Sequence, residues 1–367
     1  MTIETRKRKA DHIRISLNHD VQARKATTGL EDVCFIHKAL PEINKKQVDL
    51  STTVFGHKFA APLIVGAITG GTPEAMKINA TIAEAVEETG LGMGVGSQRA
   101  AIDDKKLEKT FAIVRKKAPT AFIIANIGGV QLVNGYGLRE VKRAVEMIEA
   151  DAIAIHLNPL QEAVQPEGQT DFKGVLEKIC EIANELDKPV IAKETGAGIA
   201  AEEAKKLEDA GVKGIDISGS GGTSWAAVEY YRAKESKNST QLRLGDVFWD
   251  WGIPTAVSIV EVSQTVNAAV IASGGIRNGV DVAKAIALGA SLTSSSQPIL
   301  HAAIKNVNET KMALSLLIDE LRNAMFLVGA ESVKSLRKTP VVITGKIADW
   351  LRTRGFNVEN YARKGRN

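Results

Sequence analysis

The stretch AAVIASGGIRNGVDVAKAIALGASLTSSSQ (268–297) decides the fold. It predicts a strand over 268–276, a turn at a glycine pair, a helix over 279–290 and a second strand over 291–297. The first strand is continuously apolar rather than alternating, which is typical of parallel strands covered on both faces. The stretch therefore predicts one strand–helix–strand unit of a parallel sheet.

The same unit recurs along the chain. Strands are predicted at 62–68, 91–96, 121–128, 151–158, 189–195, 214–220, 268–276 and 291–297. Helices are predicted at 73–90 (Thr72 as N-cap and Gly90 as C-cap), 107–118, 138–150, 171–187, 200–211, 253–266, 279–290 and around 309–329. Eight such units over about 270 residues predict an α/β fold, a (β/α)₈ TIM barrel. A doubly wound open sheet is the alternative, but its first strand would more often lead into G-x-G-x-x-G.

The two flanks are predicted to complete this domain. Residues 1–61 are expected to form an amino-terminal arm and cap, with VDLSTTVFGHKF (48–59) as a hairpin over one barrel end. Residues 62–330 form the barrel, and 331–367 a carboxy-terminal helical extension with the helix KIADWLRTRG (346–355).

Composition limits the class of protein. The chain has 367 residues, 44% of them apolar and 25% charged, so it is globular rather than disordered. A net charge of +4 gives no support to nucleic-acid binding. No apolar run reaches the roughly 18 residues that span a membrane, and the first residues lack the apolar region of a secretory signal. Cys34 and Cys180 are predicted to be reduced core thiols of a cytoplasmic protein.

Polar residues and glycines mark nearly every predicted strand end, where barrels carry their sites. After the seventh strand, Gly274 and Gly275 precede a helix, so free amides and the helix dipole suit a phosphate. Ser296 and Gln297 at the eighth strand could supply further amides. No Asp or Glu pair is evident at the strand ends.

Other side chains near the strand ends suggest individual roles. Lys193, in the apolar strand PVIAKET, is either a Schiff-base lysine or a fixed cation beside an electron-poor ring. His156 and Asn158 share one face of their strand. Glu162 suits Mg²⁺, which takes few protein carboxylates, or is a solvated loop residue.

The basic run at the amino terminus has two interpretations. Arg8, Lys9 and His12 could fold over the barrel mouth and neutralise a diphosphate. The alternative is a solvated basic tail.

Several motifs together resemble the type 2 isopentenyl-diphosphate isomerase family. They are RKADHI (8–13), TTVFGHKFAAPLIVGAITGGT (52–72), MGVGSQR (93–99), ANIG (125–128), HLNPLQEAVQPEGQTDF (156–172), KETGAGI (193–199), SGSGGTSW (218–225) and SGGIRNGVDVAKAIALGA (273–290). The HLNPLQE block is the most specific, whereas SGGIR and TTVFG are shared with other FMN barrels. The resemblance runs from Arg8 to the carboxy-terminal helix.

The resemblance implies an FMN-binding barrel that interconverts isopentenyl and dimethylallyl diphosphate in isoprenoid biosynthesis. It implies reduced FMN, Mg²⁺, NAD(P)H as reductant and a cytoplasmic homo-oligomer, a tetramer or octamer. Catalytic roles would fall to Gln161, His156 and Lys193, with Glu162 as metal ligand. FMN contacts would be Ala67, Ile68, Thr69, Ser97, Asn126, Lys193, Ser218, Thr223, Gly275, Ile276, Arg277, Ser296 and Gln297. Substrate contacts would be Arg8, Lys9, His12, Ser97, Gln98, Arg99, His156, Asn158, Gln161 and Trp225.

This sequence departs from the family pattern at two places. Ile68 stands where Met is usual, and Ser296-Gln297 replaces a more apolar pair. Both positions are expected to act largely through backbone groups, so the activity is expected to remain.

Two rival functions use the same fold. An FMN-dependent 2-hydroxy-acid oxidase or dehydrogenase shares TTVFG and SGGIR, but it needs a general-base His followed by Arg after the sixth strand. That loop here is Ser-Gly-Ser-Gly-Gly-Thr (218–223), with neither residue. A non-catalytic flavin-binding barrel would keep the phosphate site but would not need Arg99, Gln161 and Glu162.

Overall fold

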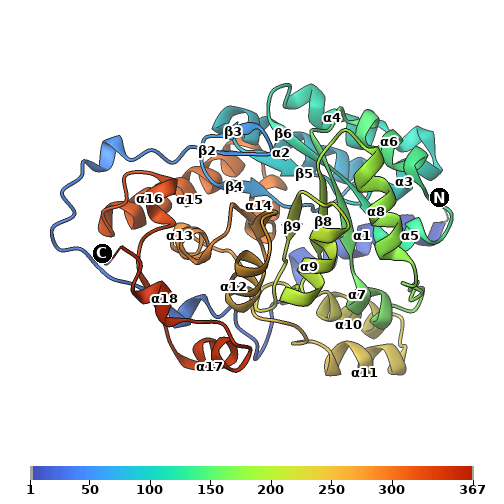
Figure 1. The fold of residues 1–367 in the computed structure, drawn as a ribbon. Helices are drawn as coiled ribbons and strands as arrows, with labels where there is room; N and C mark the ends of the chain where they lie inside the picture. Colours follow the sequence, from blue (N-terminus) through green and yellow to red (C-terminus); the bar gives the residue numbers. More distant parts are fainter. Residues whose placement is uncertain (1–2, 366–367) are drawn as a thin grey trace.

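The computed structural model describes residues 3–365, and its centre is a closed barrel of eight parallel strands (Figure 1). The last strand pairs with the first, which closes the barrel and rules out the open sheet. The strands are shorter than predicted, because their final residues turn into the loops of the mouth. In barrel order they are β4 (Leu63–Val65), β5 (Gly92–Gly94), β6 (Phe122–Gly128), β7 (Ala152–Leu157), β8 (Val190–Glu194), β9 (Gly214–Asp216), β10 (Ala269–Ala272) and β11 (Leu292–Ser295).

The predicted helices surround the barrel. The α2 helix begins after Thr72, whose side chain accepts a hydrogen bond from the Ala75 amide, and Gly90 ends it in the left-handed conformation. The caps placed from the sequence are therefore confirmed. The predicted helices are α2 (Pro73–Thr89), α4 (Lys109–Lys117), α6 (Leu138–Met147), α8 (Val175–Glu185), α9 (Ala201–Asp209), α12 (Thr255–Thr265), α13 (Gly279–Leu288) and α15 (Val307–Leu327).

Several helices that the sequence analysis did not place lie near the carboxyl ends of the strands. The first is α1 (Ile3–Asn18), whose many charged residues masked its helical pattern. Next come α7 (Pro159–Val164), α10 (Trp225–Glu235) and α11 (Ser239–Val247); the last two lie between the strand predicted at 214–220 and the helix predicted at 253–266, where no element is predicted. Short helices complete the set: α3 (Arg99–Asp103), α5 (Gly129–Leu132), α14 (Gln297–Ala303), α16 (Val333–Leu336) and α18 (Glu359–Ala362).

A hairpin of β2 (Thr52–Val54) and β3 (His57–Phe59) closes the amino-terminal end of the barrel, as predicted. Figure 1 places it at the opposite end of the molecule from α7 and α10. Phe59 is fully buried and packs its ring edge against Phe122 inside the barrel, while Phe55 stacks on the same ring. This end is therefore filled by apolar side chains.

The stretch DVCFIH (32–37) pairs with the carboxy-terminal extension. Strand β1 (Val33–Phe35) pairs antiparallel with β12 (Val341–Ile343), and α17 (Gly345–Thr353) follows, which confirms the predicted helix. Cys34 on β1 is exposed and Cys180 is half-buried, so the prediction of two core thiols was wrong. The reason is that β1 lies outside the barrel and turns every second side chain to solvent.

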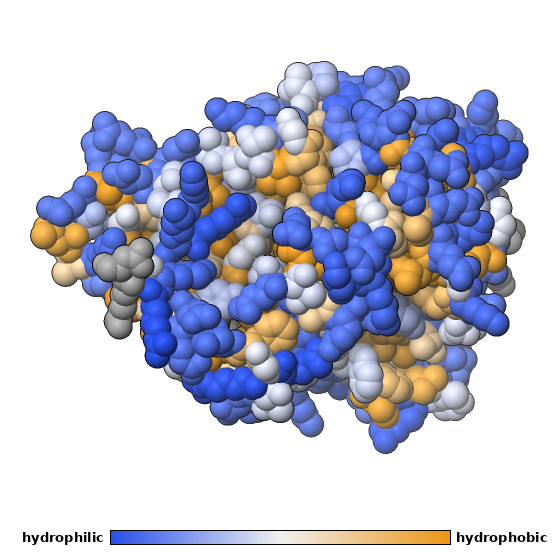
Figure 2. Space-filling model, viewed as in Figure 1, coloured by the Kyte–Doolittle hydropathy of each residue, from blue (hydrophilic) through white to orange (hydrophobic). Residues whose placement is uncertain are grey.

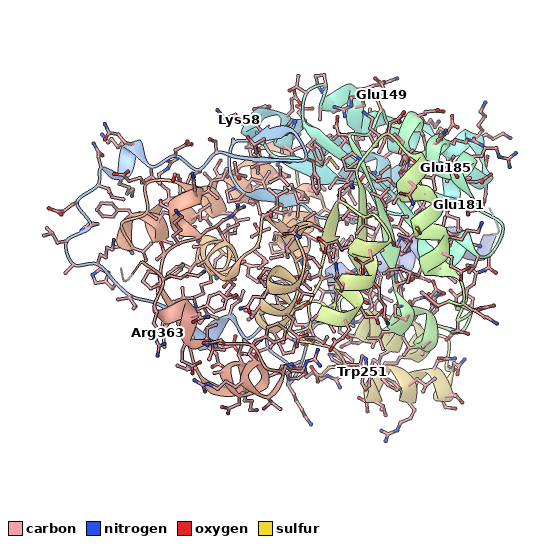
Figure 3. The ribbon with its side chains drawn as sticks, viewed as in Figure 1. Lys58, Glu149, Glu181, Glu185, Trp251 and Arg363 are labelled. Carbon is pink, nitrogen blue, oxygen red and sulfur yellow. The ribbon has the colours of Figure 1, made fainter. Side chains whose placement is uncertain are left out.

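The surface is mainly hydrophilic on the face in Figure 2, with apolar residues in small groups. Figure 3 shows Lys58, Glu149, Glu181 and Glu185 on the periphery, where they are exposed. None of the helices within residues 3–365 is long and apolar enough to cross a membrane.

Candidate active site

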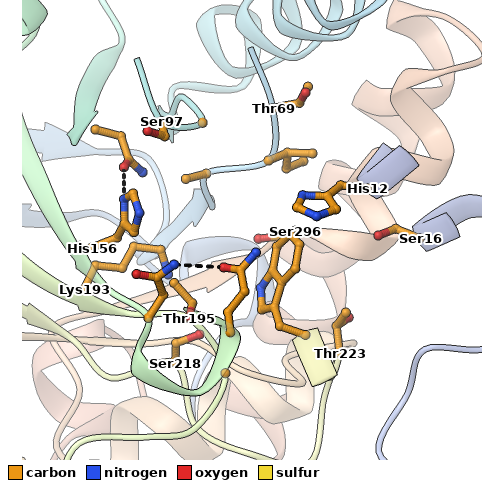
Figure 4. Close-up of a pocket in the computed structure, with 18 of the residues that line it drawn as sticks. His12, Ser16, Thr69, Ser97, His156, Lys193, Thr195, Ser218, Thr223 and Ser296 are labelled. Carbon is orange, nitrogen blue, oxygen red and sulfur yellow. Dashed lines mark hydrogen bonds between the residues drawn. The ribbon is translucent and has the colours of Figure 1, made fainter. Parts of the chain in front are cut away.

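A cavity of about 270 Å³ lies at the carboxyl ends of the barrel strands (Figure 4). Its walls come from the strand ends, the loops that follow them and α1. Every residue assigned from the sequence to FMN, substrate, metal or catalysis lines it, except Gln98. The lining also includes Ile13, Ser16, Gln131, Gln165, Ser273 and Leu300, which the sequence analysis did not nominate.

The α1 helix covers the cavity and brings Arg8, Lys9 and His12 to it. The Lys9 Nζ donates to the carbonyl oxygens of Gly70 (2.9 Å) and Ser97 (2.8 Å). Burial, with Arg8 and Arg99 nearby, lowers the pKa of Lys9 to about 7. The solvated-tail interpretation is therefore wrong for these residues, and an anion in the cavity would meet a cluster of cationic groups. The side chains of Arg6 and Lys7 lie outside the described part of the chain.

Two acidic residues hold α1 in this position. Glu229 on α10 is almost fully buried and lies 2.9 Å from His12 Nε2 and 2.5 Å from an Arg232 nitrogen. Glu167 pairs with Arg232 at 2.8 Å and lies 3.9 Å from Arg8. The sequence analysis missed both carboxylates, because their partners on α1 are far away in the chain and only the fold brings them together.

His156 is the second-last residue of β7, and it lines the cavity. Its Nδ1 lies 2.7 Å from Asn126 Oδ1, so the pair is consistent with a proton on Nδ1. Burial, together with the charges of Lys193, Lys9 and Arg8, lowers the pKa of His156 to about 4. The imidazole is therefore neutral near pH 7 and can donate or accept a hydrogen bond without adding charge.

Lys193 is paired with a carboxylate that the sequence analysis overlooked. Its Nζ lies 3.2 Å from Asp216 Oδ2, and both side chains are largely buried. The sequence analysis expected no Asp or Glu pair at the strand ends; Glu194 and Asp216 both end strands, but neither lines the cavity. The ion pair favours a fixed ammonium over the neutral amine that a Schiff base needs. The two positions could have been linked from the sequence, because neighbouring parallel strands place Lys193 and Asp216 in register.

Glu194 shapes the loop after β8 rather than the cavity. Its carboxylate accepts hydrogen bonds from the amides of Thr195 (2.6 Å), Gly196 (2.5 Å) and Ala197 (2.5 Å). Burial outweighs these bonds and raises the pKa of Glu194 to about 7. The loop that this carboxylate holds brings Thr195 and Gly196 into the cavity wall.

Glu162 is oriented by amides in the most family-specific loop. Its Oε1 accepts from Asn158 Nδ2 (3.0 Å), and its Oε2 accepts from Gln165 Nε2 (2.7 Å) and the Gln169 amide (2.7 Å). Asn158 Nδ2 also donates to Gln161 Oε1 at 3.1 Å. These bonds fix which amide atom is the oxygen, so Asn158 Oδ1 and Gln165 Oε1 are buried oxygens without a partner within residues 3–365.

This loop offers oxygen atoms that could bind a hard metal ion, but it does not provide a complete set of metal ligands by itself. The described residues contain no group of three or more His, Cys, Asp or Glu side chains that could hold a metal ion. One oriented carboxylate beside unpaired amide oxygens is what Mg²⁺ accepts when phosphate and water supply its other ligands. The donor set therefore fits the assignment of Glu162.

The glycine turn after β10 needs residues without side chains. Gly274 and Gly275 have φ values of +94° and +74°. A Cβ on Gly274 would lie 2.1 Å from the Gly219 carbonyl oxygen, and one on Gly275 would lie 2.3 Å from the Thr28 methyl carbon. Arg277 follows, half-buried, and donates to Gln22 at 2.8 Å. This turn places backbone and a guanidinium together in the cavity wall.

Gln98 was assigned to substrate, but its side chain points away from the cavity. It is fully buried, its Nε2 donates to the Ala144 carbonyl (2.8 Å), and its Oε1 accepts from the Asn126 amide (2.9 Å). The physical reason is the turn after β5, in which Gln98 is the N-cap of α3 and turns inward while Ser97 and Arg99 on either side face the cavity. Gln98 instead ties β6 to α6 and so supports Asn126.

The sequence matches a known family along most of its length. The profile of the family described as FMN-dependent dehydrogenase matches residues 4–124 and 144–343. Isopentenyl-diphosphate delta-isomerase of Methanosarcina barkeri is 50% identical over 365 residues, which cover 100% of this chain and 99% of that protein. The enzymes of the same name from Pyrococcus furiosus and Archaeoglobus fulgidus are 49% and 48% identical; they cover 97% and 96% of this chain, and 91% and 100% of their own lengths.

Solved structures share the fold at low sequence identity. A mandelate oxidase variant with a monooxide FMN adduct aligns with a TM-score of 0.60 and 22% identity, over 91% of this chain and 92% of that chain. A variant with benzaldehyde aligns with a TM-score of 0.63 and 22% identity, over 93% and 98%. At this identity the likeness establishes the barrel fold alone.

Proposed function

The chain belongs to the isopentenyl-diphosphate delta-isomerase family, within the FMN-dependent dehydrogenases, and from this premise we propose that it interconverts isopentenyl and dimethylallyl diphosphate with reduced FMN. The observation that carries the proposal is that distant parts of the chain meet at one cavity. Residues from α1, the β7 loop and the β10 turn are far apart in the sequence, yet they line one cavity together with Lys193. An oxidase of the same fold would not need the cationic helix or the Glu162 corner.

The cavity suits FMN. The glycine turn, with Arg277 and the Ser296–Gln297 segment, would hold the phosphate, since exposed amides and a guanidinium favour an anion. Ala67, Ile68 and Ile276 offer apolar contacts for a ring, and Lys193 supplies a cation beside it. Thr69, Ser97, Asn126, Ser218 and Thr223 complete the proposed contacts. When bound in its reduced form, the flavin supplies a proton-transfer site and an electron-rich face that stabilises a cation.

The diphosphate is proposed to lie beneath α1. Arg8, Lys9, His12 and Arg99 would neutralise it, with Mg²⁺ held by Glu162 as a bridge to its oxygens. The Lys9 ammonium already donates to two carbonyl oxygens, whereas the Arg8 guanidinium has only a distant partner in Glu167. Arg8 is therefore the cation more available to the diphosphate. Asn158 and neutral His156 would donate or accept hydrogen bonds without repelling the cationic groups.

Proton handling is assigned to a site that excludes water. Protonating the substrate double bond creates a tertiary cation, which must be kept dry and stabilised. Gln161 would orient the substrate or a shuttled proton, because an amide neither ionises nor donates a proton readily. Trp225, whose ring meets the His12 ring edge-on at 5.1 Å, would add a cation–π contact.

Three accompanying properties remain proposals. NAD(P)H would keep the flavin reduced, the protein would act in the cytoplasm, and copies of the chain would assemble as a tetramer or octamer. Each follows from the family resemblance.

An anaerobic isomerase assay tests the function. Purified protein with FMN, Mg²⁺ and dithionite or NAD(P)H should convert isopentenyl diphosphate, and leaving out FMN or reductant should abolish turnover. Glu162→Gln should bind FMN normally but need about 10- to 100-fold more Mg²⁺, the usual loss when a metal site is weakened. Flavin-bound, reduced protein that turns over a 2-hydroxy acid and not the diphosphate would overturn the proposal.

A further inference from the structure

Asp216 is a buried carboxylate behind the cavity wall. It ends β9, is 4% exposed and lies in register with Lys193 on β8. One of its oxygens lies 3.2 Å from Lys193 Nζ, and the other accepts a hydrogen bond from the Ser273 hydroxyl. Lys193 and Ser273 line the cavity and Asp216 does not, so Asp216 reaches the cavity only through them.

The neighbours of Asp216 fix the direction of each bond. The Ser218 amide donates to Ser273 Oγ at 3.1 Å, so the serine hydroxyl is left to donate to Asp216. Lys193 Nζ also donates to the Glu194 carbonyl at 2.9 Å. An ammonium has three N–H groups, so after these two acceptors one remains for the cavity.

We propose that Asp216 is a positioning residue that keeps Lys193 protonated and aimed at the flavin, a role that rests on the FMN site proposed above. The reason is electrostatic: burial penalises the ammonium, and an adjacent carboxylate compensates. Other titratable groups beside Lys193 are Glu194 on its own strand and His156 on β7, and Arg8 and Lys9 on α1 lie near the same His156. His156 is neutral and the Glu194 carboxylate is bound to three backbone amides, so Asp216 is the carboxylate that pairs directly with the Lys193 ammonium.

The test is the reduction potential of bound FMN against pH in the full-length holoprotein. In Asp216→Asn the potential should lie above the parent's at low pH, because a negative charge is gone while Lys193 stays protonated. As pH rises it should show one additional break that the parent lacks, and fall to the level of the double variant Lys193→Met/Asp216→Asn, which has the same neutral pair. Asp216→Glu, which retains the charge, should restore the parental profile.

A matched variant separates electrostatics from stability. Glu261 is also a buried carboxylate, 1% exposed, but it pairs with Arg354 away from the cavity. Glu261→Gln should destabilise the protein and leave the potential–pH profile unchanged.

An Asp216→Asn profile parallel to the parent's at every pH would overturn the inference and leave the proposed function standing. A parent protein that binds no FMN would instead overturn the proposed function. If Asp216→Asn does not fold, the smaller neutral replacement Asp216→Ser carries the same expectation.

Discussion

The two ends of the barrel use the same eight strands for opposite purposes. At the amino-terminal end, Phe55 and Phe59 from the hairpin pack on Phe122, and apolar contacts fill the space. At the carboxyl end, the strands finish in His156, Lys193 and other polar groups around a cavity. The amino-terminal end is filled by side chains of the protein itself. The carboxyl end keeps charged groups and buried amide oxygens that have no partner within residues 3–365, and a ligand can supply those partners.

The difference shows where stability and function separate in this fold. Filling the amino end buries apolar area and makes no demand on ligand chemistry. The mouth buries Lys9 and His156, whose solvation is lost without full compensation. Changes at the mouth should therefore alter ligand affinity or rate, and changes at the plugged end should alter stability alone.

The largest effect is expected at Gln161. Gln161→Ala should lower kcat by about 10²- to 10⁴-fold, the range typical of lost help in proton transfer. FMN affinity and Mg²⁺ dependence should stay near those of the parent, because Asn158 still holds Glu162. Anaerobic steady-state kinetics with Mg²⁺ and FMN titrations measures all three quantities.

Gln98→Ala is the matched contrast for Gln161. Its side chain lies one layer behind the mouth, so the loss should appear as thermal destabilisation with kcat close to the parent's. A Gln161→Ala enzyme with parental kcat would show that the loop is misassigned.

The second prediction compares two fully buried phenylalanines. Phe59→Ala should lower the free energy of unfolding by about 3–5 kcal/mol, with KM and FMN affinity preserved. Phe111→Ala should lose a similar amount and also raise KM, because Phe111 lies 5.3 Å from Lys9 Nζ and packs beside Gly70 near the mouth. Denaturant unfolding and steady-state kinetics on both variants test the contrast; equal kinetic effects would remove the distinction between the two ends.

The fold was predictable because its signal is local and repeated. Each strand–helix unit, such as 268–290, carries its own apolar run and caps, so the barrel follows from counting units. Residues on those units, such as Lys193 and Gly275, could be placed at the mouth for the same reason. Helix α1 could not, because its charged pattern carries little helical periodicity and its position depends on Glu229 and Glu167.

Contacts between residues that are far apart in the sequence were the other feature that could not be predicted. Gln98 was misplaced because a strand end leaves the orientation of each successive side chain open until the turn is known. Asp216 was missed because strand register, rather than any motif, brings it to Lys193.

The third prediction concerns pH. The pKa of His156 falls from its ordinary 6.5 to about 4 in the folded protein, so the unfolded chain binds more protons between these values. The contribution of His156 to the free energy of unfolding should therefore rise by about 3 kcal/mol as pH increases from 4 to 6.5. The contribution of Glu194 to the free energy of unfolding changes in the opposite direction. It should fall as pH increases from about 4.5 to 7, because burial raises the pKa of Glu194.

The measurement is thus a difference between the parent and His156→Gln, which cancels the contribution of Glu194. Urea unfolding at several pH values should give a difference that grows from pH 4 to 6.5 and then stays level. A difference that does not change with pH would mean that His156 titrates normally.

The smallest effect is expected for the arm that closes the mouth. Arg8 lines the cavity and has only a distant partner in Glu167 at 3.9 Å, so its guanidinium is available to the diphosphate. Arg8→Ala should remove one charge-assisted contact, worth about 1.5–3 kcal/mol, and raise KM about 10- to 100-fold. FMN content should not change, because the proposed flavin contacts lie on the barrel loops.

Arg14 provides the control on the same helix, since it pairs with exposed Glu235 and does not line the cavity. Arg14→Ala should leave KM within about twofold of the parent, as expected for an exposed ion pair. Equal KM values for Arg8→Ala and the parent would mean that α1 covers the mouth without binding the substrate.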